Sequence, residues 1–267
     1  MTTDPAVQGH DRSFGEEGAR LTYGSYLRLD ELLDQQRLLT EAHDELLFIT
    51  VHQVYELWFQ QLLHELVAVR EAMARGELWW ARHLLARVVT IEQVLITHVG
   101  VLETMTPQDF LQFRETLAPA SGFQSVQFRE LEFLSGAKDP GFLQRFHALT
   151  DEERARLERR LAEPTLWDAF VAVVRSAGLA ADGDEELAAS LLTVAMDRPH
   201  YGEVWELAER LLDHDQACAL WRSRHVTMVE RQIGTKSGTG GSTGAPYLRS
   251  RLGLRFYPML WDLRSQL

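Results

Sequence analysis

Cysteine is almost absent from the chain, since Cys218 is the single cysteine among 267 residues. One thiol cannot form an intrachain disulfide, and it cannot supply the set of thiolates that holds an iron–sulfur cluster or a cysteine-built zinc site. This composition is consistent with a reducing compartment. We therefore expect a cytoplasmic protein that is held together by its apolar core.

Basic residues are also scarce, with 27 Lys and Arg against 39 Asp and Glu, which leaves a formal net charge of −12. A nucleic-acid-binding protein needs a basic face, so we expect no nucleic-acid partner. No stretch approaches the roughly 20 apolar residues of a membrane span, so we expect no membrane partner. The first 20 residues are polar and acidic, which argues against a signal peptide.

The residues that are present favour one all-helical domain. Apolar residues make up 45% of the chain, enough for a sizeable core. No run of alternating apolar and polar residues predicts a strand, and no internal repeat or long linker divides the chain. We predict an all-α helical bundle over residues 21–267, preceded by a flexible N-terminal arm over residues 1–20 that is rich in Gly, Asp and Glu.

Helical periodicity locates the long helices. The segment 43–75 contains no glycine or proline and ends before Gly76, a typical helix C-terminus. A second long helix is predicted over 77–104. Thr106-Pro107 pairs a good N-cap with proline at the first helical position, which predicts a helix that stops near Pro119. Further helices are expected within 121–136, over 150–163, from Pro164, after the loop 181–186, and over 200–233.

His52 is the first candidate for chemistry. On a helix it shares one stripe with Phe48, Tyr55 or Glu56, and Phe59. An imidazole among aromatic rings is costly to bury unless it has a hydrogen-bond partner, a metal or a substrate. The alternative is a core histidine bonded to a neighbouring helix, and periodicity does not decide between the two.

His225 is the second candidate, with Arg222, Arg224 and Arg231 close to it in sequence. A neutral histidine that ligates iron, with cations near enough to meet carboxylates, would suit a haem and its propionates. The alternative is a solvated basic face on an amphipathic helix. Spacing by itself does not favour the first interpretation.

Two further features could bind a ligand. Phe110 and Arg114 are spaced i, i+4, so one helix would place a guanidinium beside an aromatic ring, as a site for an aromatic amino acid requires. A surface arginine is the alternative. Residues 237–246, SGTGGSTGAP, cannot hold a helix, and they lack the pattern of a phosphate-binding loop. Such a loop suits closure over a ligand, with Thr239 as a hydrogen-bonding group.

Four segments in order resemble the tryptophan 2,3-dioxygenase family, and the resemblance runs from about residue 21 to the C-terminus. They are LTYGSYLRLDELL, HDELLFITVHQVYELWFQQLLHEL, TPQDFLQFRETLAPASGFQSVQFRELEFLSG and WRSRHVTMVERQIGTKSGTGGSTGAPYL. The resemblance implies an all-helical protein with haem b between long helices, its iron ferrous when active. It also implies a homotetramer (a dimer of dimers) that opens the indole ring of L-tryptophan with O2 to give N-formyl-L-kynurenine.

The family pattern also implies roles for individual residues. His225 matches the iron ligand, and His52 matches the distal histidine that bonds the substrate's indole N–H. Ser121 and Gly122 match the turn against the haem edge, and Arg129 is a weaker match near a propionate. The residues that match substrate contacts are Phe48, Phe110, Arg114 and Thr239, with Tyr23 and Tyr26 matching arm tyrosines contributed across a subunit interface.

The chain departs from the family pattern in two places. Val54 and Tyr55 stand where familiar members have Thr-Ser, and the region from about 150 to 200 is shorter. The larger side chains of Val54 and Tyr55 keep open a haem monooxygenase of the same fold that inserts one oxygen into another indole, whereas the shorter region bears on the lid and the outer substrate pocket. Arg114 and Thr239 argue against it, since an indole without a carboxylate would not need them. A haem or indole sensor without turnover, and a purely structural bundle, are the alternatives from other classes.

Overall fold

The structure is a computed structural model that describes residues 21–145, 149–240 and 243–267. The predicted flexible arm, residues 1–20, lies outside the described residues. The chain divides into two compact units, residues 1–38 and 39–267, and each is described by itself. The described residues contain helices and no strand, which confirms the all-α prediction.

The described residues of the first unit, 21–38, contain two short helices, α1 (Tyr23–Leu27) and α2 (Leu29–Leu32). Thr22 begins α1 with a capping box in which its hydroxyl accepts from the Ser25 backbone N–H. Arg28, with φ of 52°, separates the two helices in the left-handed conformation. Tyr23 and Tyr26 are 77% and 70% exposed, so neither side chain is buried within this unit.

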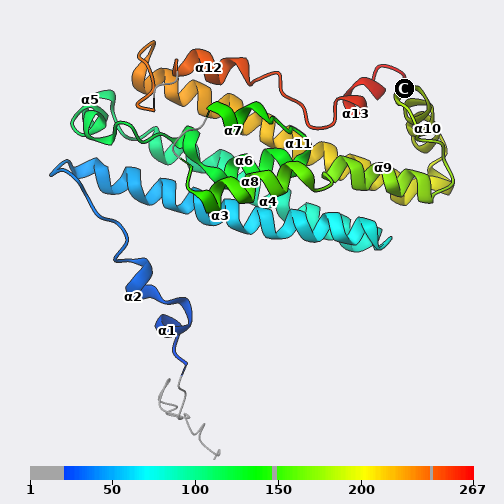
Figure 1. Ribbon diagram of the computed structural model, residues 1–267, viewed down its shortest axis with the longest axis horizontal. Coiled ribbons are helices and arrows are strands. Elements are labelled where there is room, and N and C mark those ends of the chain that lie inside the picture. Colours follow the sequence, from blue (N-terminus) through cyan, green and yellow to red (C-terminus); the bar gives the residue numbers. More distant parts are fainter. Residues whose placement is uncertain (1–20, 146–148, 241–242) are drawn as a thin grey trace, which may run out of the picture. The chain divides into compact units, whose positions relative to one another are not determined.

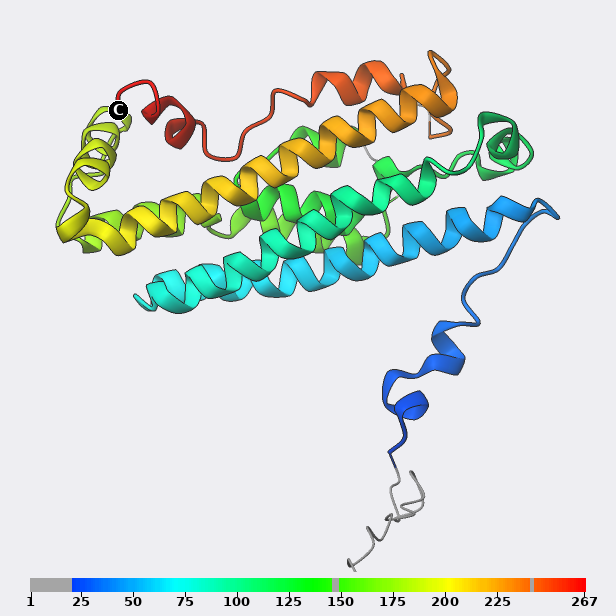
Figure 2. The ribbon, with the colours of Figure 1, turned by 180° about the vertical axis from the view of Figure 1, so that it is seen from behind.

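Three long helices form the framework of the second unit: α3 (His43–Ala74), α4 (Leu78–Leu102) and α11 (Arg198–Ile233) (Figure 1). They confirm the spans predicted from periodicity. Gly76, with φ of 73°, provides the sharp turn between α3 and α4. α4 packs along both α3 and α11 (Figure 2), and the N-terminal end of α3 lies at the same end of the bundle as the C-terminal ends of the other two.

α4 is the one described helix that is long and apolar enough to cross a membrane by length and composition alone. We expected no such segment from the sequence, because Arg82, Arg87 and Glu92 interrupt its apolar residues. Its buried residues, among them Leu84, Leu85 and Val88, belong to the core that the long helices share. The core helix of a globular protein meets the same criterion.

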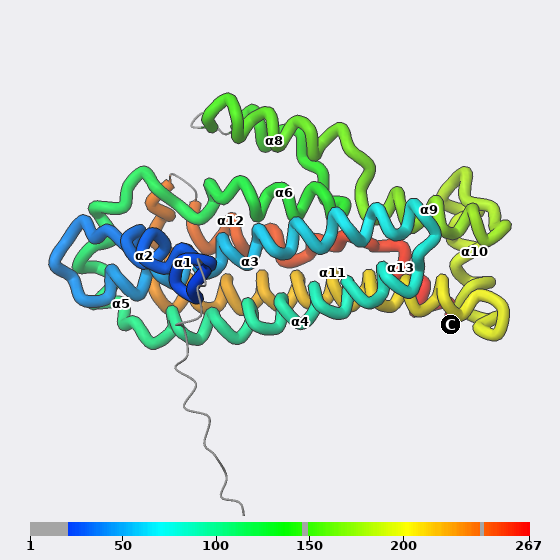
Figure 3. The backbone as a smooth tube through the Cα atoms, turned by 90° about the horizontal axis from the view of Figure 1, so that it is seen from below, coloured from blue at the N-terminus to red at the C-terminus, as the bar shows by residue number. Residues whose placement is uncertain are grey.

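Shorter helices cover the framework. α6 (Val126–Ser135) packs on α3, and α8 (Asp151–Ala162) packs on α6 (Figure 3). Thr165 is the N-cap of α9, so this helix begins two residues after Pro164, where the sequence predicted its start. The remaining helices of this unit are α5 (Pro107–Leu111), α7 (Gly141–Arg145), α9 (Leu166–Ser176), α10 (Asp184–Met196), α12 (Ala245–Ser250) and α13 (Pro258–Leu263).

The helix predicted from Thr106-Pro107 to Pro119 is wrong in its length. Thr106 caps α5 as expected, but α5 ends at Leu111 and a 3-10 turn follows over Arg114–Leu117. Phe113 leaves the helical region, with φ of −128° and ψ of −8°, and its side chain is fully buried. Burial of this ring breaks the helix, so Phe110 and Arg114 do not lie one turn apart on a single helix.

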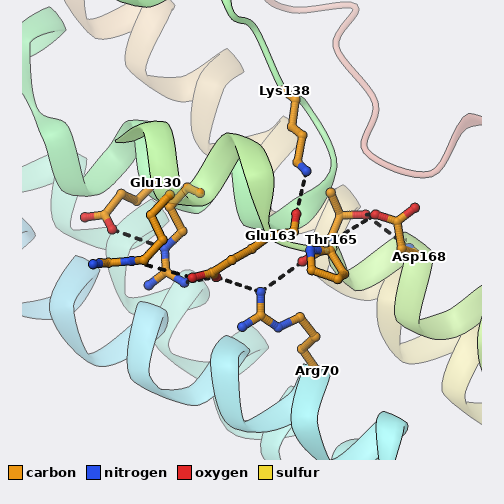
Figure 4. A network of polar contacts seen from close by, with 9 residues as sticks. Arg70, Glu130, Lys138, Glu163, Thr165 and Asp168 are labelled. Carbon is orange, nitrogen blue, oxygen red and sulfur yellow. Dashed lines mark hydrogen bonds and ion pairs between the residues drawn. The ribbon is translucent and has the colours of Figure 1, made fainter. Parts of the chain in front are cut away.

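A polar network fastens α8 to the framework (Figure 4). Glu130 on α6 is buried and accepts hydrogen bonds from Arg156 and Arg160 of α8. Glu163 accepts from Arg160 and from Arg70 of α3, with N–O distances of 3.0 and 2.9 Å. Because both carboxylates meet guanidinium groups, this region gains connections between helices without an uncompensated buried charge.

Candidate active site

A cavity of about 530 Å³ opens at the end of the bundle where α3 begins and where α4 and α11 end. Its volume lies within the roughly 300–1,000 Å³ of pockets that hold small molecules and cofactors. Nine of the predicted site residues line this cavity: Phe48, His52, Phe110, Arg114, Ser121, Gly122, Arg129, His225 and Thr239. Tyr23 and Tyr26 belong to the other unit, which is described by itself.

His52 is held in one tautomer by its own helix. Its Nδ1 lies 2.7 Å from the Phe48 carbonyl oxygen, one turn earlier on α3. A carbonyl oxygen can only accept, so Nδ1 carries the proton and donates it. Burial lowers the pKa of His52 below its usual value of 6.5, although the Phe48 carbonyl and Glu56 oppose the shift. At neutral pH, Nε2 therefore has a free lone pair and can accept a hydrogen bond.

Aromatic rings pack against this histidine. The Phe48 ring lies 4.1 Å from the His52 ring and 5.7 Å from the ring of Phe110, measured between centroids. Phe113 meets Phe48 edge-on at 5.6 Å, which explains why Phe113 is buried. The three phenylalanines form an apolar wall with which a flat aromatic ligand could pack.

His225 is neutral and has no hydrogen-bond partner in the described part of the chain. Burial, with a smaller effect of His52, lowers its pKa to about 4. The ring stacks on the Trp221 indole, with centroids 5.1 Å apart and planes within 5°. Since it is unprotonated near neutral pH, this imidazole can offer a nitrogen lone pair to a metal ion. A metal-ligating histidine usually donates a hydrogen bond from its second ring nitrogen, and no acceptor for that nitrogen is found among the described residues.

Positive charge exceeds negative charge on the wall formed by α6, α11 and the segment after α12. Glu132 pairs with Arg129, and its Oε1 lies 3.5 Å from Arg222 and 3.8 Å from Arg251. All four residues line the cavity. One carboxylate thus faces three guanidinium groups, and the buried Nε of Arg129 has no partner. This wall can receive one or two anionic groups.

The glycine-rich loop rests on the turn around Ser121. Arg114 donates a hydrogen bond to the Ser237 carbonyl, and Thr239 donates to the Ala120 carbonyl at 2.6 Å. A Cβ on Gly240 would lie 2.4 Å from the Cβ of Ser121, so only glycine allows this approach. The loop therefore closes one side of the cavity and brings Arg114 and Thr239 to its edge.

Comparison with known proteins identifies the family. A family model described as Tryptophan 2,3-dioxygenase matches residues 6–190 and 183–267. The chain belongs to the tryptophan 2,3-dioxygenase family. It is 66% identical over 261 residues to the tryptophan 2,3-dioxygenase of a Nocardioides species, an alignment that covers 96% of this chain and 98% of that relative. The tryptophan 2,3-dioxygenases of Herpetosiphon aurantiacus and Caulobacter vibrioides are 47% and 44% identical, over 92% of this chain and 98% of each relative.

Tyr55, a departure from the familiar dioxygenase pattern, is a structural part of the cavity wall. Its hydroxyl donates to the Leu95 carbonyl on α4 at 2.9 Å, and burial raises its pKa to about 12. Its ring stacks with His98 at 5.2 Å. Tyr55 therefore joins α3 to α4 beside the cavity, and it stays protonated in the physiological range.

The sequence did not predict some of the residues that line the cavity. Trp221 precedes His225 by one helical turn, a spacing that could have indicated contact. Glu132 and Arg251 could not be found in this way, because Glu132 meets Arg222 and Arg251 only through the packing of α6, α11 and the segment after α12.

Proposed function

We propose that this protein is a haem-dependent tryptophan 2,3-dioxygenase, which opens the indole ring of L-tryptophan with O2 to give N-formyl-L-kynurenine. The observation that supports this most directly is that one cavity holds two neutral histidines, His52 and His225, together with Arg114. The names of the relatives agree with this activity and do not favour insertion of one oxygen atom. We further propose that the enzyme is cytoplasmic and acts in the kynurenine pathway.

The residues of the cavity fit haem b. The cavity volume is adequate, and His225 offers an unprotonated nitrogen without a competing partner among the described residues. Three guanidinium groups, those of Arg129, Arg222 and Arg251, lie beside one carboxylate. The Nε–H of Arg129 is a buried donor without an acceptor among the described residues. Two propionates would balance this excess of charge. We assign His225 as the iron ligand, Arg129 to a propionate, and Ser121 and Gly122 to the haem edge.

Haem would supply the binding and activation of O2, and the chain's own residues place the substrate. His52 accepts a hydrogen bond from the indole N–H at Nε2, because its Nδ1 already donates to the Phe48 carbonyl. A neutral acceptor at this position fixes the height and direction of the indole ring and leaves the proton on the indole nitrogen. Phe48 and Phe110 pack against the ring and exclude water.

Arg114 and Thr239 hold the amino-acid end of the substrate. The Arg114 guanidinium already reaches a carbonyl oxygen, that of Ser237, so it is positioned for the stronger charged partner that a carboxylate provides. Thr239 contributes a hydroxyl at the same edge. Fixing both ends of tryptophan gains rate through orientation. We propose that Tyr23 and Tyr26 complete the site of a neighbouring subunit in a homotetramer, a dimer of dimers.

The test is an assay of the haem-reconstituted protein with L-tryptophan, ascorbate and O2, read by product mass. A product that carries two additional oxygen atoms supports the proposal. A product with one additional oxygen would establish the monooxygenase instead. A haem spectrum without any turnover, on L-tryptophan or on indole, would contradict an enzymatic role.

A further inference from the structure

A second group of side chains with metal-binding chemistry lies away from the active site. Glu92 of α4 meets His214 and Cys218, which are one turn apart on α11. The Glu92 Oε1 atom is 2.6 Å from Nδ1 of His214 and 3.2 Å from Sγ of Cys218, and Sγ is 4.0 Å from Nδ1. Glu92 and His214 are 4% and 2% exposed. His214 precedes His225 by eleven residues, or roughly 17 Å of helix.

The second nitrogen of His214 is held as it is in metal sites. Its Nε2 lies 2.9 Å from the hydroxyl of Ser135, a fully buried residue on α6. Metal-binding histidines nearly always have a hydrogen-bond partner on the nitrogen that does not ligate, because this partner fixes the ring and its tautomer. The imidazole is therefore oriented with Nδ1 toward Glu92 and Cys218.

The charge on Glu92 is not balanced by a basic side chain. Among the described residues, no Lys or Arg forms an ion pair with it. Its Oε2 atom is buried without a hydrogen-bond partner. A cavity of about 30 Å³ borders all three side chains, large enough for one water molecule. An interior carboxylate with one free oxygen beside such a space is costly unless a cation or a donor fills it.

The nearby charged groups are already engaged. Asp215 accepts hydrogen bonds from the backbone N–H groups of Phe256 and Tyr257 and from the indole of Trp261. Arg222 is directed to Glu132. Neither neighbour therefore supplies a donor or a cation to the free Oε2 atom of Glu92.

We propose that Glu92, His214 and Cys218 form a binding site for a divalent transition-metal ion, with zinc as the best match. A +2 ion with one carboxylate, one thiolate and one neutral imidazole gives a buried site with no net charge. The three residue types are all zinc ligands, and a water in the adjoining cavity supplies the fourth position of a tetrahedron. Tetrahedral zinc places its ligand atoms about 3.3–3.7 Å apart. The three separations of 2.6, 3.2 and 4.0 Å lie within about 0.7 Å of that range, so small shifts of the side chains accompany binding of the ion.

Occupancy involves a balanced exchange of protons. The ion replaces the proton on the Cys218 thiol, which leaves to solvent. The proton on Nδ1 of His214 moves to Nε2, where the Ser135 hydroxyl accepts the hydrogen bond, so the imidazole stays neutral. Burial raises the pKa of the free Cys218 thiol, so the thiolate forms when the metal binds and not before. Cys218 is only half-buried, which leaves a route for the ion to enter.

The experiment counts zinc and iron in the full-length, haem-loaded protein by elemental mass spectrometry after exposure to zinc and removal of excess metal. One zinc per chain is expected in addition to the haem iron. Zinc-depleted protein titrated with Co²⁺ is expected to show a thiolate-to-cobalt absorption band. Cys218→Ser and His214→Gln should each weaken zinc binding by more than about 100-fold, while Ser135→Ala, which keeps every ligand, should weaken it by about 10–100-fold.

The readouts separate this site from the active site. Wild-type protein without bound zinc and without the cobalt band would overturn the proposal, as would zinc binding by Cys218→Ser with wild-type affinity. If either ligand variant fails to fold, the zinc count and the cobalt band of the wild type still decide. Haem content is measured in the same samples, so a failure of the proposed dioxygenase activity cannot be mistaken for a failure of the metal site.

Discussion

The indole of Trp221 and the imidazole of His225 stack on one face of α11, with centroids 5.1 Å apart and ring planes within 5°. The indole is itself packed by Phe128 at 5.1 Å and by Tyr55 at 6.2 Å, so it does not turn freely. The plane of the histidine is thus set by packing, before any metal binds. A ligand held in place in advance loses less entropy when it binds its metal.

The first prediction concerns the two cavity histidines. His225→Ala should lower haem occupancy by at least about 10-fold, because it removes the iron ligand that we propose, and even the loss of an outer-shell partner weakens metal binding by about 10–100-fold. His52→Ala is the matched control: it removes an imidazole from the same cavity and should leave haem content unchanged. Its kcat/KM for tryptophan should fall by about 10-fold, as expected for the loss of one neutral hydrogen bond. Haem is measured by absorbance after purification, and normal occupancy in His225→Ala would contradict the assignment.

The second prediction concerns Arg114. Arg114→Ala should weaken tryptophan binding by roughly 2–5 kcal/mol, the cost of breaking a charged contact in a dry site. The affinity for tryptamine, which lacks the carboxylate, should change far less. Titration of both ligands into wild type and variant gives the comparison. Equal losses for the two ligands would show that Arg114 acts through the loop carbonyl of Ser237 and not through the substrate.

The third prediction concerns Gly240. An alanine there would place its Cβ 2.4 Å from the Cβ of Ser121, so the glycine-rich loop must move away from the turn. Gly240→Ala should raise KM for tryptophan and leave haem content intact. Gly253→Ala, at a position with open space around it, is the control. Adding Ser121→Gly to Gly240→Ala removes the opposing atom and should recover part of the affinity, and no recovery would mean that the clash is not the cause.

The fourth prediction concerns pH. Protonated His52 would carry hydrogen on both ring nitrogens and could not accept the indole N–H. Because its pKa is lowered below 6.5 in the folded protein, kcat/KM should stay level as the pH falls to 6.5 and decline only below it. An analogue methylated on the indole nitrogen should not show this decline. The same shift makes the folded state less stable under acid: its contribution is present above pH 6.5 and is lost as the pH falls through the lower folded-state value.

The long helices were predictable because their information is local. The segment 43–75 has helical spacing and a glycine stop, and α3 follows it closely. The break at Phe113 was not predictable in this way, because it depends on a buried contact with Phe48, 65 positions earlier in the chain. A proline-capped start fixes where a helix begins, and tertiary packing decided where this one ended.

The candidate site shows the same division. His52 and His225 could be selected from their sequence neighbourhoods, since each lies on a helix among aromatic or basic residues. The group of Glu92, His214 and Ser135 could not, because its members come from three helices and the His214 hydrogen bonds span 122 and 79 positions. No short motif encodes such a group, and only the lateral packing of α4, α6 and α11 assembles it.

The length of α11 has a consequence for how this chain can change. One helix carries His214, Cys218, Trp221 and His225: the first two meet Glu92 of α4, and the last two stack on each other and line the cavity. An inserted or deleted residue between His214 and His225 would rotate one end against the other by about 100° and shift it by about 1.5 Å. Either His225 would leave the cavity, or His214 and Cys218 would lose their contacts with Glu92. The number of residues in this stretch of α11 therefore fixes the spacing and relative direction of the two sites. Substitutions at its exposed positions can be tolerated, but insertions and deletions cannot.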